Sequence, residues 1–367
     1  MDATTRGLAV GLEIDGDGAH PAAWRYAAHP PDELLTPARL AGTGHRAEAA
    51  GYTFVTLDDR AGADPGAGVA GRFDPVTAAA FLSAHTSAPG LVPVVPTAHA
   101  EPFHVSNQLS GLDHGSAGRA GWLAVGGESP ERSAAYAVRH ESAPAVLAGE
   151  TGDVVRAARW LWDSWQDDAI IADEATGRFL DADRVHHVDF RGRTFSVRGP
   201  ALVPRPPQGQ VPVFAPAGTL APDLVDVGIV TAPDVDGLLA ADPGAARSLA
   251  EIEIVLDTPD APAADRLAAL DRHARWPAGR RLRHVGDADG LVALLRTLAA
   301  RFDAVRLLPA VLDVDGAVLA GRVLPALGSL LHRPVPGATL RDAFGLPRPA
   351  GRFDPAGQQA APSDRAS

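Results

Sequence analysis

The chain has 367 residues and a net charge of −12, and it contains no cysteine and no lysine. Without cysteine, the protein has no disulfides, thiolate catalysis or cysteine-bound metal, and without lysine it has neither a P-loop lysine nor a Schiff base. The acidic balance argues against nucleic acid or an anionic membrane as a partner. No apolar run reaches the ~18 residues that span a membrane, and the N-terminal stretch is too short and too acidic for a signal peptide. We therefore expect a cytoplasmic protein.

Apolar segments alternate with segments of helical spacing along most of the chain. Eight apolar, mostly β-branched segments predict strands near residues 7, 52, 91, 120, 212, 226, 251 and 304. Helical spacing predicts helices at 33–50, 74–85, 101–114, 152–165, 234–248, 262–274, 289–301 and 317–331. Eight strands that alternate with helices are typical of an α/β protein with the (β/α)8 fold, the TIM barrel.

Two parts of the chain depart from this alternation. Residues 166–210 contain hairpin-like pieces and a proline-rich return, which predict an insertion in the barrel. The strands at 211–215 and 225–230 are only about ten residues apart, so the crossover helix after strand five is predicted to be shortened. We therefore predict one TIM-barrel domain over residues 1–353, followed by a disordered tail over residues 354–367.

The loops that follow the predicted strands carry polar and aromatic side chains. In a (β/α)8 barrel these loops gather at one mouth, which is where ligands bind. The candidates are His20, Trp24, Asp58, Asp59, Thr97, His99 and His104. Histidines suit proton transfer, an aromatic ring suits stacking on a planar ligand, and a carboxylate suits a hydrogen bond to a polar ligand. Spacing alone does not separate these roles from those of ordinary loop residues.

A second polar cluster has the residue types of a metal site. It consists of Asp181, Asp183, His186, His187 and Asp189. The cluster lacks the i, i+4 spacing of helical metal ligands and lies in the polar insertion, so a solvated hairpin is favoured and no metal site is predicted. A metal-dependent hydrolase that uses this cluster stays open as an alternative.

Six motifs are spread over nearly the whole chain. They are HPAAWR (20–25), TAHAEPFHVS (97–106), LDHGSAGRAGW (112–122), LWDSWQDDA (161–169), RVHHVDFRGRTFSVRGPALVPRPPQGQ (184–210) and TLRDAFGLPRPAGRF (339–353). In order and spacing they resemble the motifs of the bacterial-luciferase-like flavin-dependent monooxygenases, in the branch that contains nitrilotriacetate monooxygenase component A and dibenzothiophene sulfone monooxygenase. Of these, GRAGW and FSVRGP followed by PRPPQGQ are specific to the branch.

The resemblance implies a TIM barrel with insertions that binds reduced FMN (FMNH2) and uses O2 to oxygenate a small organic substrate. A separate NAD(P)H:flavin reductase would supply the flavin, and a homodimer is expected. Carried over residue by residue, the flavin-binding positions are Trp24, Asp58, Asp59, Thr97, Trp122, Gly218 and Thr219. The candidates for catalysis are His20, His99 and His104.

The chain also departs from the family pattern at the flavin site. Leu123 stands where the family has an asparagine. A QAGSSEAG-like turn holds the FMN phosphate at a helix N-terminus in the family, and here it reads PAGTLAPD (216–223), with Leu220 for the second serine and an interrupting Pro222. A second reading therefore stays open beside the monooxygenase: a degenerate relative that keeps the barrel, no longer binds FMN, and binds a small molecule or a partner instead.

Overall fold

The fold was analysed in a computed structural model of the chain. The structure describes residues 7–58, 71–98, 101–126, 144–277 and 279–354. The predicted site residues Asp59 and His99 lie outside these ranges, as does the predicted disordered tail apart from its first residue.

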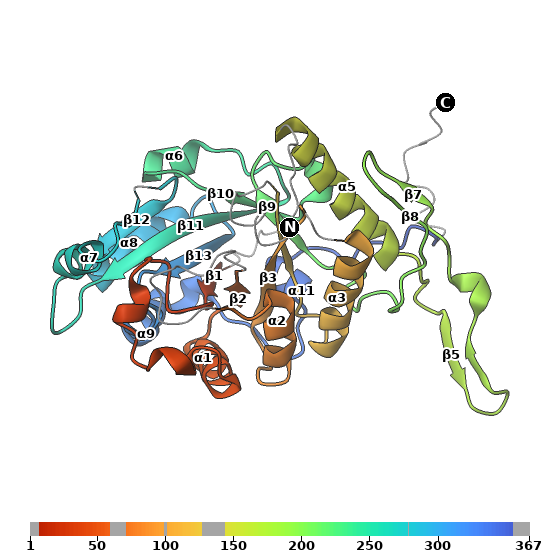
Figure 1. The fold of residues 1–367 in the computed structure, drawn as a ribbon, viewed down its shortest axis with the longest axis horizontal. Coiled ribbons are helices and arrows are strands. Elements are labelled where there is room, and N and C mark those ends of the chain that lie inside the picture. Colours follow the sequence, from red (N-terminus) through yellow and green to blue (C-terminus); the bar gives the residue numbers. More distant parts are fainter. Residues whose placement is uncertain (1–6, 59–70, 99–100, 127–143, 278, 355–367) are drawn as a thin grey trace.

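Eight parallel strands close into a barrel (Figure 1). In ring order they are β1 (Leu8–Glu13), β2 (Phe54–Leu57), β3 (Gly90–Pro96), β4 (Trp122–Val125), β9 (Val213–Pro216), β10 (Val227–Val230), β11 (Arg247–Leu256) and β13 (Ala304–Pro309). The ring closes where β13 pairs with β1, with Ala304 opposite Ala9. The eight predicted strands and the TIM-barrel fold are confirmed.

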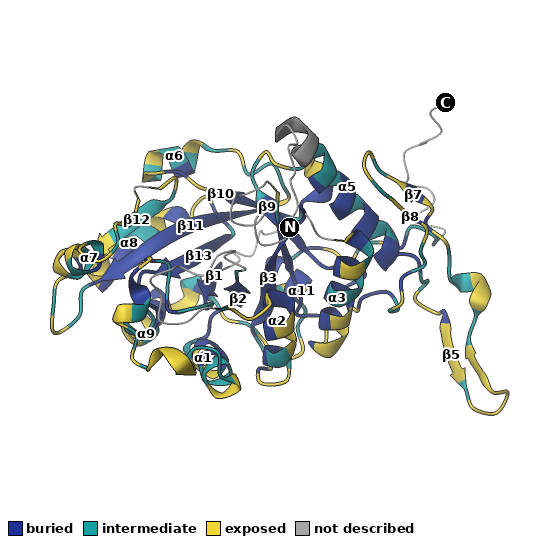
Figure 2. Cartoon of the chain, viewed as in Figure 1, coloured by how far each residue is buried: buried dark blue, intermediate teal, exposed yellow. Residues whose placement is uncertain are grey.

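The strands are buried on both faces, which explains their nearly continuous apolar sequences. Successive side chains alternate between the barrel lumen and the layer beneath the helices. Ala9, Phe54 and Phe214 belong to the lumen cluster, whereas Val10 and Trp122 belong to the larger cluster between sheet and helices. Figure 2 shows the result, with buried strands at the centre and exposed residues on the outer faces of the helices.

Helices cover the outside of the barrel. They are α1 (Pro37–Ala50), α2 (Pro75–Ser83), α3 (Pro102–Gly115), α5 (Pro144–Trp162), α6 (Val235–Ala240), α7 (Ala263–Asp271), α8 (Ala288–Leu298), α9 (Leu312–Val318) and α10 (Leu324–Leu327), with a π-helical turn, η5 (Leu319–Val323), between the last two. The first three begin with proline after a capping side chain, which is Thr36, Asp74 or Glu101. Because Thr36 is the cap, α1 begins at residue 37 and not at the predicted residue 33.

Other predicted boundaries are also wrong. Helix α5 begins at Pro144 and not at residue 152, and the last helical stretch begins at Leu312 and not at residue 317. Helix α6 ends at Ala240, and β11 already begins at Arg247, because Pro243 and the left-handed Gly244 (φ 62°) separate the two elements. An additional strand, β12 (Leu282–Gly286), pairs with the second half of β11 outside the ring. Its polar residues and its partial burial explain why the sequence pattern did not predict it.

The connections around β9 match the expected interruption of the barrel pattern. Between β9 and β10 the chain forms a short 3-10 helix, η4 (Pro222–Leu224), in place of a full helix, so the shortened crossover is confirmed. The segment between α5 and β9 forms two hairpins. These are β5 (Ile170–Asp173) with β6 (Arg178–Leu180), and β7 (Phe190–Arg191) with β8 (Ser196–Val197). The first hairpin stands away from the barrel (Figure 1).

The C-terminal segment closes the amino-terminal end of the barrel. Strand β14 (Leu331–His332) pairs with the start of β1, and α11 (Leu340–Phe344) packs against the lumen cluster. The Phe344 ring lies 5.7 Å from the Phe54 ring and 5.2 Å from the Phe214 ring. A ligand therefore has to approach from the opposite end, where the strands finish. No helix in the described part of the chain is both long and apolar enough to cross a membrane.

Candidate functional site

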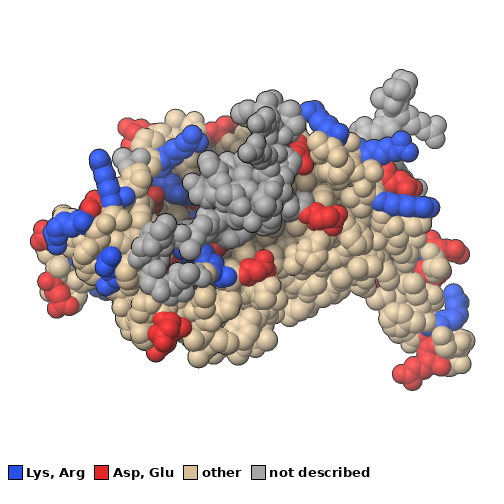
Figure 3. All heavy atoms as spheres, in the orientation of Figure 1, with Lys and Arg blue, Asp and Glu red and all other residues tan. Residues whose placement is uncertain are grey.

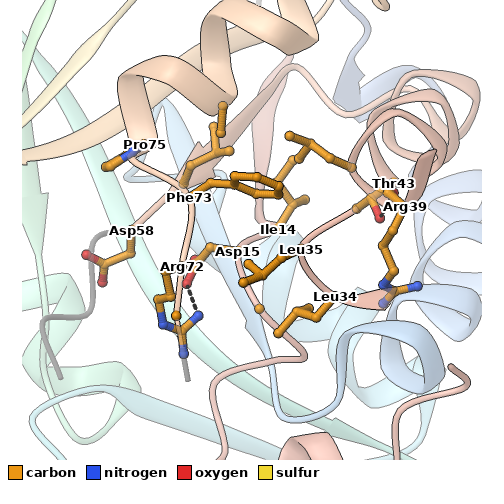
Figure 4. Close-up of a pocket in the computed structure, with 15 residues that line it drawn as sticks. Ile14, Asp15, Leu34, Leu35, Arg39, Thr43, Asp58, Arg72, Phe73 and Pro75 are labelled. Carbon is orange, nitrogen blue, oxygen red and sulfur yellow. Dashed lines mark hydrogen bonds and ion pairs between the residues drawn. The ribbon is translucent and has the colours of Figure 1, made fainter. Parts of the chain in front are cut away.

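A pocket opens where β1 and β2 end (Figure 4). Most of its wall is apolar and comes from the loops after these strands and from α1 and α2. The apolar lining residues include Ile14, Leu34, Leu35, Leu40, Leu57, Phe73, Pro75 and Ala78. Four charged residues also line it: Asp15, Arg39, Asp58 and Arg72. An apolar cavity with a few polar groups at the carboxyl ends of barrel strands is typical of a ligand site.

Arginine–aspartate pairs hold both cationic side chains of the pocket. Arg72 donates to Asp15 at 3.3 Å, and Arg39 donates to both carboxylate oxygens of Asp313 at 2.9 Å. The Arg72 guanidinium lies against Gly16, whose φ of 62° and lack of a Cβ permit the close approach. Both cations that line the pocket are therefore already neutralised within the protein.

An ion-pair network occupies the lumen next to this pocket, where branched apolar residues are usual. Arg306 of β13 is 3% exposed and donates to Glu13, to Glu251 at 2.5 Å and to Thr56 at 2.9 Å. Burial disfavours the charge on Arg306, but the carboxylates of Glu13 and Glu251 raise its pKa above the ordinary value. Asp58 adds a further attractive charge, which connects the network to the pocket.

His20, a predicted catalytic residue, lies in the loop after β1 and is buried. Its Nδ1 accepts the Ala22 N–H at 3.0 Å, so the proton sits on Nε2, which lies 3.1 Å from Asp271. Burial lowers the pKa of the imidazole and outweighs the opposite effect of Asp271. Both ring nitrogens are engaged, so in this conformation His20 fixes the loop. A catalytic role for His20 stays a prediction.

Three other predicted residues lie at this end of the barrel without forming one cluster. Trp24 is partly buried, with the Arg25 guanidinium 4.2 Å from its ring centre. Thr97 is buried, and its hydroxyl bonds to Thr151 of α5 at 2.9 Å. His104 is exposed on the first turn of α3. Of the predicted residues in the described ranges, only Asp58 lines the pocket.

Trp122 lies outside the lumen. Its ring is fully buried between β4 and the helices, in edge contact with Trp162 at 6.3 Å, and its N–H donates to Val95 at 3.2 Å. Its neighbour Leu123 points the other way, into the lumen cluster. The structure thus separates Trp122 from Asp58, because Trp122 lies at the start of β4 and faces the helices, whereas Asp58 follows the end of β2.

The turn after β9 carries the remaining predicted residues, Gly218 and Thr219. Both are exposed, and Gly218 has a φ of 76°. The Thr219 N–H and hydroxyl both donate to the carbonyl oxygen of Pro216, at 3.1 and 2.6 Å. The next element, η4, has three residues, too few to present the free N–H groups of a helix N-terminus.

The site offers different environments to the two ends of the flavin that the sequence predicts. The apolar wall and the Asp58 carboxylate fit a planar ring that carries N–H donors. The turn after β9 does not fit the phosphate, because both donors of Thr219 are occupied within the turn. The site therefore suits the ring system and departs from the expected phosphate cradle.

The polar cluster of residues 181–189 is engaged in other contacts. Asp181 caps a short 3-10 helix, η3 (Ala182–Arg184), His186 stacks on Phe353 at 4.2 Å, and His187 bonds to the Gly199 carbonyl at 2.8 Å. Within the described ranges, no three histidine or acidic side chains come together in a way that could hold a metal ion. The structure gives no support to the hydrolase alternative.

Sequence reasoning missed the lumen network and the Asp15–Arg72 pair. A signal for the network was present, because Glu13, Glu251 and Arg306 are charged residues inside otherwise apolar strands. The alternation of side chains in a strand would have placed them in the lumen. No comparable signal marks Arg72, which lies in a loop.

A family model described as luciferase-like monooxygenase matches residues 19–320. Among curated relatives, N-acetyl-S-(2-succino)cysteine monooxygenase of Bacillus subtilis (strain 168) is 33% identical over 60% of this chain and 50% of its own length. A component of pristinamycin IIA synthase of Streptomyces pristinaespiralis is 41% identical over 52% of this chain and 63% of its own length. Nitrilotriacetate monooxygenase component A of Aminobacter aminovorans is 31% identical over 58% of this chain and 50% of its own length. The chain thus spans about half the length of the curated relatives it matches.

Solved structures agree on the fold. A riboflavin lyase has a TM-score of 0.77 at 21% identity and covers 97% of this chain, with all of its own chain matched. The EDTA monooxygenase of Chelativorans sp. BNC1 has a TM-score of 0.74 at 18% identity over 94% of this chain and 99% of its own. Because the family model covers most of the barrel, the chain belongs to the luciferase-like monooxygenase family.

Proposed function

We propose that this chain is a flavin-dependent monooxygenase that uses reduced flavin and O2 to oxidise a small organic substrate. The observation that carries the proposal is the apolar pocket at the ends of β1 and β2, with Asp58 in its wall, on a barrel of the luciferase-like family. Reduced FMN is the proposed cofactor. When bound, it would supply the activation of O2, which no amino-acid side chain performs.

The chain's own residues would bind and orient the flavin ring and shield it from water. Asp58 would hold the polar edge of the flavin ring, and the wall formed by Leu34, Leu35 and Phe73 would exclude water. The Arg306 network keeps the strand ends beneath the pocket in fixed positions, because one guanidinium joins β1, β2 and β11 to β13. The other predicted residues remain proposals: Trp24, Asp59, Thr97 and Trp122 for the cofactor, and His20, His99 and His104 for catalysis. Gly218 and Thr219 remain proposed positions beside the cofactor, although their turn does not fit its phosphate.

A separate NAD(P)H:flavin reductase is the proposed partner. The nitrilotriacetate enzyme is named as component A and the pristinamycin IIA protein as one part of a synthase, which supports a system of more than one protein. Dependence on a pyridine-nucleotide reductase would place the enzyme in the cytoplasm.

We also propose a homodimer. The β5–β6 hairpin stands away from the barrel and exposes Ile170, Ile171 and Phe179, the last at 66% (Figure 1). Exposed apolar groups on a protruding strand pair are typical of an interaction surface. Light scattering of the wild type should give twice the mass of one chain. The Phe179→Asp variant should give a lower mass, closer to that of one chain. A monomeric wild type contradicts the proposal.

An anaerobic titration tests the proposed cofactor. Chemically reduced FMN is added to the purified chain and flavin fluorescence and absorbance are followed; saturable binding at micromolar flavin is expected. Asp58→Asn should weaken binding about tenfold, the loss of one charge-assisted hydrogen bond. The exposed Asp183→Asn is the matched control and should bind like the wild type.

Two outcomes would contradict the proposal. If no saturable binding is found even at high micromolar flavin, the chain is a barrel that has lost its cofactor and binds something else. If Asp58→Asn binds as well as the control variant, the ring does not occupy this pocket. For a wild type that binds flavin, oxygen uptake in the presence of a flavin reductase and a panel of organic substrates measures turnover.

A further inference from the structure

We propose that this chain recognises its flavin by the ring system and leaves the 5′-phosphate unbound, so that riboflavin binds as tightly as FMN. The proposal rests on the flavin-dependent function above. It concerns the turn after β9, a part of the expected cofactor site that does not fit.

Both donors of Thr219 are used inside the turn. The backbone N–H and the hydroxyl of Thr219 both donate to the Pro216 carbonyl, at 3.1 and 2.6 Å. Leu220 offers no hydroxyl and packs against the main apolar core, and Pro222 has no N–H. A phosphate could therefore accept from Thr219 only after these two hydrogen bonds were broken.

The turn also lacks positive charge. Phosphate sites combine backbone N–H groups with a helix N-terminus or with a basic side chain. The connection from β9 to β10 contains no arginine, and the whole chain contains no lysine. Arg159 and Arg341, which approach this connection from outside, are both paired with its Asp226, at 2.8 and 3.3 Å. The helical piece of this connection is η4, of three residues, whose dipole is negligible.

The arginines described near the other side of the site are committed elsewhere. Arg39 is held by both carboxylate oxygens of Asp313, and Arg72 pairs with Asp15. Within the described ranges, every cation that lines the pocket already has an acidic partner. Transfer of the phosphate to one of them would leave a carboxylate without its cation, which offsets the gain.

The test compares two probes on the full-length chain. Dissociation constants for reduced FMN and reduced riboflavin are measured anaerobically by absorbance or fluorescence, at low and at high salt. The two constants should agree within about threefold, since a single charge-assisted hydrogen bond would already separate them by roughly tenfold or more. The FMN constant should change little with salt, because no ion pair forms.

A variant with an added cation tests whether the FMN phosphate lies beside the turn after β9. Thr219→Arg adds a cation at the exposed apex of the turn, and it should bind FMN about tenfold tighter than riboflavin. The matched control, Thr297→Arg, adds the same cation on the last turn of α8, at the closed end of the barrel, and should leave the ratio near one.

The outcomes separate this inference from the proposed function. If wild-type FMN binds tenfold tighter than riboflavin, or if Thr219→Arg shows no FMN preference, the inference is overturned while the flavin enzyme stands. If neither flavin binds, the proposed function itself fails. Equal wild-type affinities together with a preference confined to Thr219→Arg support the inference.

Discussion

At the scale of single residues, Tyr52 is an unusual member of the core. It is 1% exposed, and its hydroxyl has no hydrogen-bond partner within the described part of the chain. Burial alone raises the pKa of the phenol, so the group stays neutral. The residue lines a groove beside α1 and α9, together with the small residues Ala47 and Gly316. The hydroxyl therefore carries a desolvation cost without a compensating bond.

Tyr52→Phe removes this cost and leaves the ring in place. We expect the free energy of unfolding to rise by about 1 kcal/mol, measured by urea denaturation. Tyr26→Phe is the control, because Tyr26 is 40% exposed and its hydroxyl can reach water. A loss of stability in Tyr52→Phe would show that the hydroxyl has a partner.

Asp113 is a buried carboxylate with well-defined donors. Gln208 donates to it from its side chain at 2.6 Å and from its backbone at 3.2 Å, and the Ala120 N–H donates at 3.2 Å. Burial raises the pKa of the carboxyl to about 6, against the lowering effect of these donors. The folded state therefore keeps a proton that the unfolded chain releases near pH 4.

This pKa shift predicts a pH dependence with a definite sign. Between about pH 4 and pH 6 the folded state binds more protons than the unfolded state, so stability falls as the pH rises. At neutral pH the raised pKa of Asp113 should lower the free energy of unfolding by about 3 kcal/mol. Urea denaturation across this range should show the decline in the wild type and a flatter curve in Asp113→Asn. Parallel curves would refute the raised pKa.

At the scale of elements, three of the family motifs build the closed end of the barrel. The backbone N–H of Arg341 in the C-terminal motif donates to Gln208 at 2.8 Å, and its guanidinium donates to the Gln210 carbonyl at 2.8 Å. Gln208 in turn bonds to Asp113 of α3. The residues of these three motifs thus join the insertion, α3 and the C-terminal segment, far from the pocket.

The packing of α11 predicts a large effect from one substitution. Phe344 is 1% exposed against Phe54 and Phe214, so Phe344→Ala should lower the free energy of unfolding by about 3–5 kcal/mol. Val335→Ala, at a residue 62% exposed in the same segment, should change it by less than about 0.5 kcal/mol. Equal effects would mean that α11 does not close the barrel.

At the scale of the whole molecule, Arg306 holds the ring of strands together. It bonds to Glu13 of β1, Thr56 of β2 and Glu251 of β11. Arg281, just before β12, also donates to Glu251, at 2.5 Å. Burial raises the pKa of Glu251, but the charges of Arg306 and Arg281 outweigh this effect and hold the pKa below its ordinary value. The side where the ring closes is therefore fixed by charge, whereas the opposite side is fixed by apolar contacts.

Removal of this guanidinium leaves two buried carboxylates without their shared cation. Arg306→Met should lower the free energy of unfolding by about 3–5 kcal/mol at neutral pH. Adding Glu13→Gln and Glu251→Gln to Arg306→Met should restore much of the loss, because the uncompensated charge is gone. Denaturation of the three-fold variant beside Arg306→Met measures this, and an unchanged stability of Arg306→Met would contradict the role of the network.

On the face shown in Figure 3, arginine and acidic side chains are interspersed. This agrees with the modest net negative charge of the sequence and gives no extended basic patch among the described residues of that face.

The sequence by itself determined the number and order of the barrel strands, because each buried strand needs its own short apolar segment between turns. It also determined the missing crossover helix, since about ten residues cannot form one and return to the sheet. The position of Asp58 beside the pocket followed from the rule that ligands bind at strand ends.

Only the tertiary structure decided which polar residues meet. Arg306 and Glu13 lie near opposite ends of the sequence, and their contact exists only because β13 pairs with β1. The partners of the His20 ring nitrogens, Asp271 and Ala22, are likewise decided by the tertiary structure. The same is true of the face of β4 on which Trp122 lies, because that face depends on the strand register. Local patterns specify where a strand or a turn forms, whereas contacts across the barrel depend on how the ring closes.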